Sequence, residues 1–315
     1  MEKIELRKAR DFGQLFNDSI AFLRLNFKSF FGTIFFLAGP FVLLTGMLTG
    51  FLEYVSAQLA ISNRLSGLGV GRISMFAGNS PSTIIIYAFI LLLTTLVANA
   101  TIAIYFKLYD KTSVEELPIQ RKNISSLLSA ACWRLFYNIL LLIIIMSVFG
   151  LALVAVFYLF GQLGIFQVIV GLIVFVTCII LIPALVYIIT VANFIVIRDE
   201  ILITAAIGKT INYLRGNFWQ TWIFIFCTCI ALGMLYFIFN ISLILNYINL
   251  FTRGVDSFST NHSVLSMVLS TISLMGRVLI ISPILTCFCI FNFYNQEERH
   301  EGTSLMNRID TLDKN

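Results

Sequence analysis

Long apolar runs separated by short charged segments dominate the pattern of this chain. Ser29 to Leu52 is a stretch of 24 residues without a charge, and no Lys, Arg, Asp or Glu occurs in the 63 residues between Arg134 and Arg198. A helix that crosses the roughly 30 Å hydrocarbon core of a bilayer needs about 20 apolar residues. The second stretch is therefore long enough for two helices. The six predicted spans are 29–52, 81–106, two helices within 135–197 joined by a turn at 161–164, 218–247 and 264–294.

The composition supports this interpretation. Hydrophobic residues make up 59% of the 315 residues and charged residues only 12%, with a mean hydropathy of +0.93, whereas a soluble domain is roughly 45–50% apolar and about 25% charged. These values exclude a soluble globule, a disordered chain, a disulfide-rich secreted module and a nucleic-acid binder. The run Leu140 to Ile145 does not alternate as the strands of a membrane barrel do. The fold class predicted is all-α, as a polytopic membrane protein.

The distribution of Lys and Arg predicts the orientation. The N-terminal segment, the 107–134 loop, the 198–217 loop and the C-terminal tail together hold 17 basic residues, and the opposite loops hold three, with Arg277 left out of both counts. Cytoplasmic loops carry the excess of Lys and Arg. Both termini are therefore predicted to be cytoplasmic.

Three cytoplasmic interfacial amphipathic helices are predicted, at about 11–28, 122–134 and 199–216, each before an odd-numbered span. Ser19–Phe27 aligns without gaps on Thr210–Phe218, and five of the nine positions are identical. The middle copy is much weaker. The match suggests a threefold pseudo-repeat, although a chance match between apolar segments is the alternative. The predicted units are 11–106, 122–197 and 199–294 of a single membrane domain, 1–295, which a cytoplasmic tail follows at 296–315.

The matched segments contain the candidate contacts to lipid or to a partner. Arginine beside a span can meet lipid phosphates, aromatic residues suit the membrane interface, and asparagine can cap or turn the chain between two helices. The simpler interpretation is a collar that only anchors the chain. The candidate residues are Arg24, Asn26, Phe27, Arg215, Asn217, Phe218 and Trp219.

The third amphipathic segment also carries a family resemblance. Its start at Asp199-Glu200, the Lys209-Thr210 step and the run Leu214–Trp219 resemble the cytoplasmic helix of a membrane-domain superfamily. That superfamily is found fused to some bacterial glycerophosphodiester phosphodiesterases and also as stand-alone six-span proteins. The tail, Gln296–Gly302 and Leu305–Asp310, is similar to the ends of uncharacterised bacteroidete members. The resemblance implies a bacterial inner-membrane protein. This chain has no phosphodiesterase barrel, so no hydrolase activity is implied.

Residues with obvious chemistry are scarce. The six cysteines lie in or beside apolar runs, where thiols pack as small apolar groups. The two histidines, His262 and His300, are far apart, and no HExxH pair, Walker loop or nucleophile elbow occurs. We therefore predict no enzyme activity, no catalytic residue, no metal site and no cofactor.

Arg277 is the exception, because it lies inside the sixth predicted span. An arginine at mid-bilayer costs roughly 3 kcal/mol on insertion scales, so it should face the bundle interior, a polar cavity or a lipid headgroup. In the alternative, 262–276 lies at the outer surface and the span starts near Val278. Pro40, Pro183 and Pro283 interrupt three spans and are weak indications of a moving part.

Two functions are compatible with these features. The first is a non-enzymatic subunit or scaffold of a bacterial envelope complex, whose partners are the lipid bilayer and other envelope membrane proteins. The alternative is a transporter or lipid-handling protein with a path near Arg277.

Overall fold

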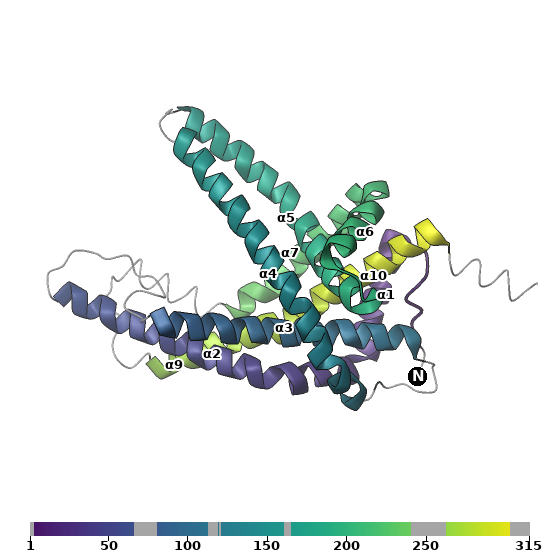
Figure 1. Ribbon diagram of the computed structural model, residues 1–315, viewed down its shortest axis with the longest axis horizontal. Coiled ribbons are helices and arrows are strands. Elements are labelled where there is room, and N and C mark those ends of the chain that lie inside the picture. Colours follow the sequence, from purple (N-terminus) through teal and green to yellow (C-terminus); the bar gives the residue numbers. More distant parts are fainter. Residues whose placement is uncertain are drawn as a thin grey trace, which may run out of the picture. The chain divides into compact units, whose positions relative to one another are not determined.

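The computed structural model describes residues 3–65, 81–112, 119, 121–160, 165–240 and 263–302. Within these ranges the chain forms helices and no strand (Figure 1). The all-α prediction is therefore confirmed for the described part. The helices are α1 (Phe12–Leu25), α2 (Phe27–Leu65), α3 (Pro81–Lys111), α4 (Arg121–Phe160), α5 (Ile165–Asp199), α6 (Ile203–Gly216), α7 (Phe218–Phe239), α9 (Ser263–Met275), the π-helix η4 (Gly276–Ile281) and α10 (Ser282–Glu301).

Several helices are long and apolar enough to cross a membrane. By length and composition, five such segments occur among the residues searched, which are those the structure describes. These helices indicate a multi-pass membrane protein. The five segments are Phe27–Leu52, Thr83–Lys111, Ile180–Asp199, Phe218–Phe239 and Val268–Glu301.

The first predicted span, 29–52, lies in α2, whose candidate membrane span is Phe27–Leu52, and the helix itself continues to Leu65. The segment 122–134, predicted as a separate interfacial helix, is the first part of the continuous helix α4. The fifth predicted span, 218–247, begins as α7, and its residues 241–247 lie outside the described residues. The turn at 161–164 and residues 241–262 lie outside the described residues. The helices α4 and α5, before and after residues 161–164, run as an antiparallel pair (Figure 1).

The chain divides into two compact units. Unit 1 contains 1–26, 103–229 and 285–315, and unit 2 contains 27–102 and 230–284. Each unit is thus assembled from segments that lie far apart in the sequence.

In unit 2, α2 packs along α9 and also contacts α3 (Figure 1). A β-carbon on Gly46 of α2 would lie only 2.8 Å from the Cα of Thr271 in α9, so glycine is what allows this close approach. Between α2 and α3, the hydroxyl oxygens of Thr45 and Thr94 lie 2.6 Å apart. Small residues and paired hydroxyl groups of this kind are typical of helix contacts in membranes.

In unit 1, the core is aromatic. The ring of Phe22 in α1 stacks on Phe106 at 4.9 Å and meets the edges of Tyr109 and Phe291 at 5.0 and 5.4 Å. Aromatic pairs in these geometries stabilise by about 1 kcal/mol beyond the area that they bury. The contacts fix α1 against the end of α3 and against α10.

Proline explains the π-helical segment. Pro283 has no backbone N–H to donate to the carbonyl of Leu279, and its ring crowds that carbonyl. The helix adapts before the proline, and the backbone N–H of Ser282 donates to the carbonyl of Arg277, five residues earlier. Helix α9, η4 and α10 follow one another without a break. Pro40 and Pro183 lie inside α2 and α5, which continue through them.

Candidate functional site

The helices α1 and α6 are alike in structure as well as in sequence. Each has 14 residues, and each is followed after one asparagine by a long apolar helix, α2 or α7. We call α1 and α6 the junction helices. At the start of α1, a capping box forms between Asp11 and Gln14, whose backbone N–H donates to the Asp11 side chain over 2.8 Å.

Equivalent positions of the junction helices are buried in the same way. Ser19 and Thr210 are both fully buried, and each hydroxyl donates to the carbonyl four residues earlier, over 2.7 and 2.9 Å. Three positions later in the alignment, the matched residues Phe22 and Tyr213 are also buried. Each junction helix therefore packs against unit 1 through the same face.

The two asparagines end the junction helices as the sequence predicts for a cap. The backbone N–H of Asn26 donates to the carbonyl of Phe22 over 2.9 Å, and its side-chain amide donates to the same oxygen. The backbone N–H of Asn217 donates to the carbonyl of Leu214 over 3.1 Å, and its side chain donates to Gln296. Each asparagine thus satisfies a carbonyl that the end of a helix leaves free.

The predicted interfacial side chains lie mostly on the outside. Arg24 and Arg215 are exposed, Phe27 and Trp219 are 60% and 63% exposed, and Phe218 is half-buried. Each junction helix thus places an arginine and an aromatic ring next to the start of a long apolar helix. That arrangement suits a headgroup region or a protein surface that is both acidic and apolar.

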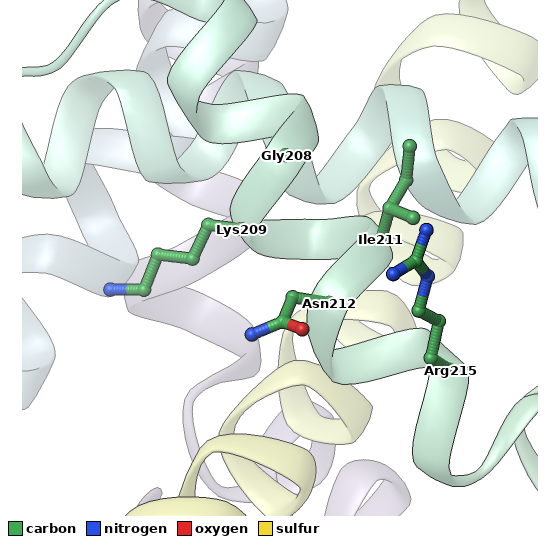
Figure 2. Close-up of a pocket in the computed structure, with 5 residues that line it drawn as sticks. All are labelled: Gly208, Lys209, Ile211, Asn212 and Arg215. Carbon is green, nitrogen blue, oxygen red and sulfur yellow. The ribbon is translucent and has the colours of Figure 1, made fainter.

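A shallow hollow lies along the exposed side of α6. Figure 2 shows Lys209 and Asn212 pointing to one side of the helix, and Ile211 and Arg215 lying together on the other. Lys209 is already bound, because its Nζ lies 3.0 Å from an oxygen of Asp199. The hollow therefore does not bring two free cations together, and Arg215 is the side chain that can engage a partner.

The middle segment lacks this junction. Arg134 stands where the other copies have Arg24 and Arg215, and two residues later the chain has Phe136 in place of asparagine. Phenylalanine has no side-chain group that could cap a helix end, and α4 continues without a break. Trp133 and Tyr137 are exposed on this part of α4.

A buried ionic cluster, which sequence reasoning missed, lies in unit 1. The guanidinium of Arg198 in α5 donates to both carboxylate oxygens of Glu297 in α10, over 2.8 and 2.6 Å, and to Asp199. The side chains of Arg198 and Glu297 are only 8% and 3% exposed. The rings of Phe194, Phe293 and Tyr294 surround the guanidinium, with centroids 4.8 to 5.7 Å from its central carbon. Every charge of the cluster is therefore paired.

Glu200, directly after α5, joins three helices. Its carboxylate accepts hydrogen bonds of 2.9 Å from Lys107 of α3 and from Arg134 of α4. The hydrogen bonds from Arg134 and then Lys107 lower the pKa of Glu200 to about 2. Its backbone has a φ of +59°, a region that favours glycine and costs other residues about 1–2 kcal/mol. A glutamate at this position indicates that its carboxylate is needed there.

The N-terminal segment packs against the ends of α3 and α10. Arg10 is 2% exposed, its Nε lies 2.7 Å from Asp18, and its backbone N–H donates to Asn295 over 2.7 Å. Arg7 forms a salt bridge of 3.0 Å with Asp110. The helix α10 itself continues to Glu301, which accepts a hydrogen bond from Tyr213, so the predicted tail boundary at 296 falls inside a packed helix.

Arg277 has much weaker contacts than Arg198. Its guanidinium carbon lies 5.9 Å above the ring of Tyr236, and its buried Nε has no hydrogen-bond partner. Among the described residues, no carboxylate lies within ion-pair distance. One helical turn before it, Ser273 donates to Asn240 over 2.6 Å. The structure thus places Arg277 within a continuous helical segment of unit 2, half-buried and without a counter-ion in the described chain.

The remaining titratable groups suggest no reaction centre in the part of the chain that is described. No three His, Cys, Asp or Glu side chains there come close enough to hold a metal ion. Cys132, Cys227, Cys229, Cys287 and Cys289 are free thiols. Burial and the hydrogen bond to Glu301 raise the pKa of Tyr213 above its ordinary value, so this phenol keeps its proton.

Comparison of the chain with protein-family models, with curated proteins and with solved structures gives no match. The functional interpretation therefore rests on the residues and contacts described above.

Proposed function

We propose that this chain is a non-enzymatic scaffold or subunit of a bacterial envelope complex. In this proposal it lies in the cytoplasmic membrane with six transmembrane helices, and both termini are cytoplasmic. The six are the five candidate spans given above and the apolar part of α4. The exposed faces of the junction helices receive a partner of complementary chemistry, which is an acidic and apolar segment of another membrane protein.

The salt bridges of unit 1 are the observation that carries the topology. All four segments that the basic residues mark as cytoplasmic belong to this unit. Arg7–Asp110 joins the first to the second, Lys107–Glu200 the second to the third, and Arg198–Glu297 the third to the fourth. Segments in direct contact lie on the same side of a bilayer, so the contacts support a single cytoplasmic side for all four.

The junction helices support the threefold pseudo-repeat that we propose for the membrane domain. The matched hydroxyls, aromatic rings, arginines and asparagines of α1 and α6 occupy equivalent positions. In the middle unit, Phe136 replaces the capping asparagine, which explains why its amphipathic segment is fused to the span. We also propose that the chain belongs to the membrane-domain superfamily that it resembles.

The chemistry of the exposed faces supports a docking role. Ile211 and Arg215 lie side by side on α6 (Figure 2). In the sequence alignment, Ile20 and Arg24 of α1 match these two residues, and both are exposed. In contrast, the buried cations of unit 1 are all held by carboxylates of the same unit. An arginine and an isoleucine at matching positions of the two junction helices are thus available to a partner.

The test is quantitative affinity isolation of the full chain from its own membrane. We expect a stoichiometric membrane-protein partner, and we expect the double variant Ile211→Glu, Arg215→Glu to release it, since these changes reverse the charge and remove the apolar contact. Lys122→Glu is the matched control, because it reverses an exposed cation on α4 away from the junction helices.

The outcome that contradicts the proposal is a lone wild-type chain, or a partner that the α6 double variant retains as well as the wild type does. Removal of 303–315 is the companion variant. It keeps α10 intact to Glu301, whereas a cut at 296 would remove the buried Glu297 and disturb the fold.

A further inference from the structure

Unit 2 contains a cation whose charge the described chain does not neutralise. Arg277 forms no ion pair with a described residue, and its Nε, although buried, donates to nothing. An arginine cannot lose its proton in a protein, and an unpaired charge inside a membrane costs several kcal/mol. A charge in this position therefore calls for an anion from outside the described chain.

The local backbone positions this side chain inside an apolar helical segment. Arg277 lies in η4, about 21 Å along the helix from the start of α9 at a rise of 1.5 Å per residue. The close contact of Gly276 with the ring of Phe239 holds η4 against the end of α7, since a β-carbon there would lie 2.4 Å from that ring. π-Helical turns are frequent at functional sites in proteins.

The described neighbours of Arg277 leave its buried Nε without a hydrogen-bond acceptor. Tyr236 contributes its ring face below the guanidinium and is 44% exposed. The next residues of α7 on the same exposed stretch are apolar, namely Phe237 and Ile238. Ser273 and Asn240 bind each other and so do not compete for the guanidinium. The end of α7 that carries Tyr236 is therefore exposed and largely apolar, which suits a ligand with an apolar part.

We infer that Arg277 and Tyr236 form a binding site for a phosphate oxyanion carried by a phospholipid. The guanidinium offers a planar fork of N–H donors that matches two phosphate oxygens. The exposed apolar residues that follow Tyr236 in α7 suit the acyl chains, which a free phosphate ion does not have. This site is independent of the scaffold role proposed above, because it uses no residue of the junction helices.

Native mass spectrometry of the full chain tests the site. The protein is exchanged into detergent, mixed with phosphatidylglycerol, and the bound lipid is counted. We expect the wild type to retain one phospholipid that Arg277→Met loses, with retention weakened about ten- to a hundredfold because two charge-assisted hydrogen bonds disappear. Tyr236→Leu should weaken retention less, and Arg277→Lys should fall between the wild type and Arg277→Met.

Two further measurements keep the inference open to refutation. Lys122→Met is the matched control, since it removes an exposed cation on α4 that belongs to neither proposed site and should leave the retained lipid in place. Equal retention by the wild type and Arg277→Met overturns the site. Displacement of the lipid by inorganic phosphate overturns the phospholipid source, because the site then recognises the oxyanion alone. If Arg277→Met does not fold, Arg277→Lys and Tyr236→Leu provide the comparison.

Discussion

Arg198 and Arg277 both lie in apolar helices, but their surroundings differ. In unit 1, the guanidinium of Arg198 binds Glu297 with two hydrogen bonds, contacts Asp199 and lies among three aromatic rings. In unit 2, Arg277 has one ring beside it and an Nε without a partner. A buried charge that is fully paired belongs to the architecture of a fold, whereas one with unused donors is a candidate for binding. The comparison separates the structural arginine of this protein from the one proposed to function.

The largest expected effect comes from breaking the paired cluster. Glu297→Ala leaves Arg198 with Asp199 as its remaining carboxylate, and the loss of one member of a buried ion pair costs about 3–5 kcal/mol. Thermal unfolding in detergent, followed by size exclusion, measures the change. The double variant Arg198→Met, Glu297→Leu should recover part of the stability, because it removes both charges together. A double variant less stable than Glu297→Ala would contradict a structural role for the pair.

Removing Arg277 should have the opposite sign. Arg277→Met takes an unpaired cation out of an apolar helix, and insertion scales predict a gain of up to about 3 kcal/mol. We therefore expect an unfolding temperature equal to or above that of the wild type, measured in detergent without added phospholipid. Marked destabilisation would show that Arg277 has a structural partner in the folded chain, and would remove the contrast with Arg198.

Replacing the aromatic neighbours of the two arginines should change stability by less than replacing the charged residues does. The loss should be larger in unit 1 than in unit 2. Phe293→Leu removes a ring 4.8 Å from the buried Arg198 guanidinium, whereas Tyr236→Leu removes one 5.9 Å from Arg277. Cation–π contacts contribute about 2 kcal/mol when desolvated and about 0.5–1 kcal/mol when exposed. Unfolding in detergent should therefore show the larger loss for Phe293→Leu. Equal losses would mean that the two arginines lie in similar environments.

The smallest effect concerns the exposed ion pairs at the end of α5, and it depends on pH. The pKa of Glu200 is lowered to about 2 in the folded protein, compared with about 4.3 for an ordinary glutamate. Its contribution to stability is therefore fully present above about pH 4.3 and is lost as the pH falls through about 2. The unfolding temperature of Glu200→Gln should lie slightly below that of the wild type at pH 7, and the difference should vanish near pH 2. A difference that does not change with pH would refute the bridge to Lys107 and Arg134.

Local features of the fold could be predicted from the sequence. The repeated asparagines at 26 and 217 predict the ends of the junction helices, and the structure places caps at both. The middle segment was predicted as a separate helix because its periodicity and its arginine resemble the other copies. The prediction failed there because the turn depends on one capping residue, and position 136 is phenylalanine.

The partners of charged residues could not be predicted in the same way. In the sequence, Glu297 belongs to a charged segment predicted as a tail, and Arg198 is a basic residue at the end of a predicted span. The structure pairs these two residues across 99 positions of the chain and buries both. No short-range pattern encodes this pair, because it depends on α5 and α10 meeting at their ends. Arg10 was missed for the same reason, since its partner Asn295 lies 285 residues away.

The sequence by itself determined that this protein is helical and that its helices suit a membrane. Backbone groups in lipid must satisfy their hydrogen bonds within the protein, and a long apolar run that does not alternate does so as a helix. Only the tertiary structure decided which charges are neutralised and which are left with unused donors. A hydrogen bond or a buried ion pair needs its two groups about 3 Å apart. Whether two groups come that close depends on how helices far apart in the sequence pack. This packing gives Arg198 its carboxylates and gives Arg277 none among the described residues.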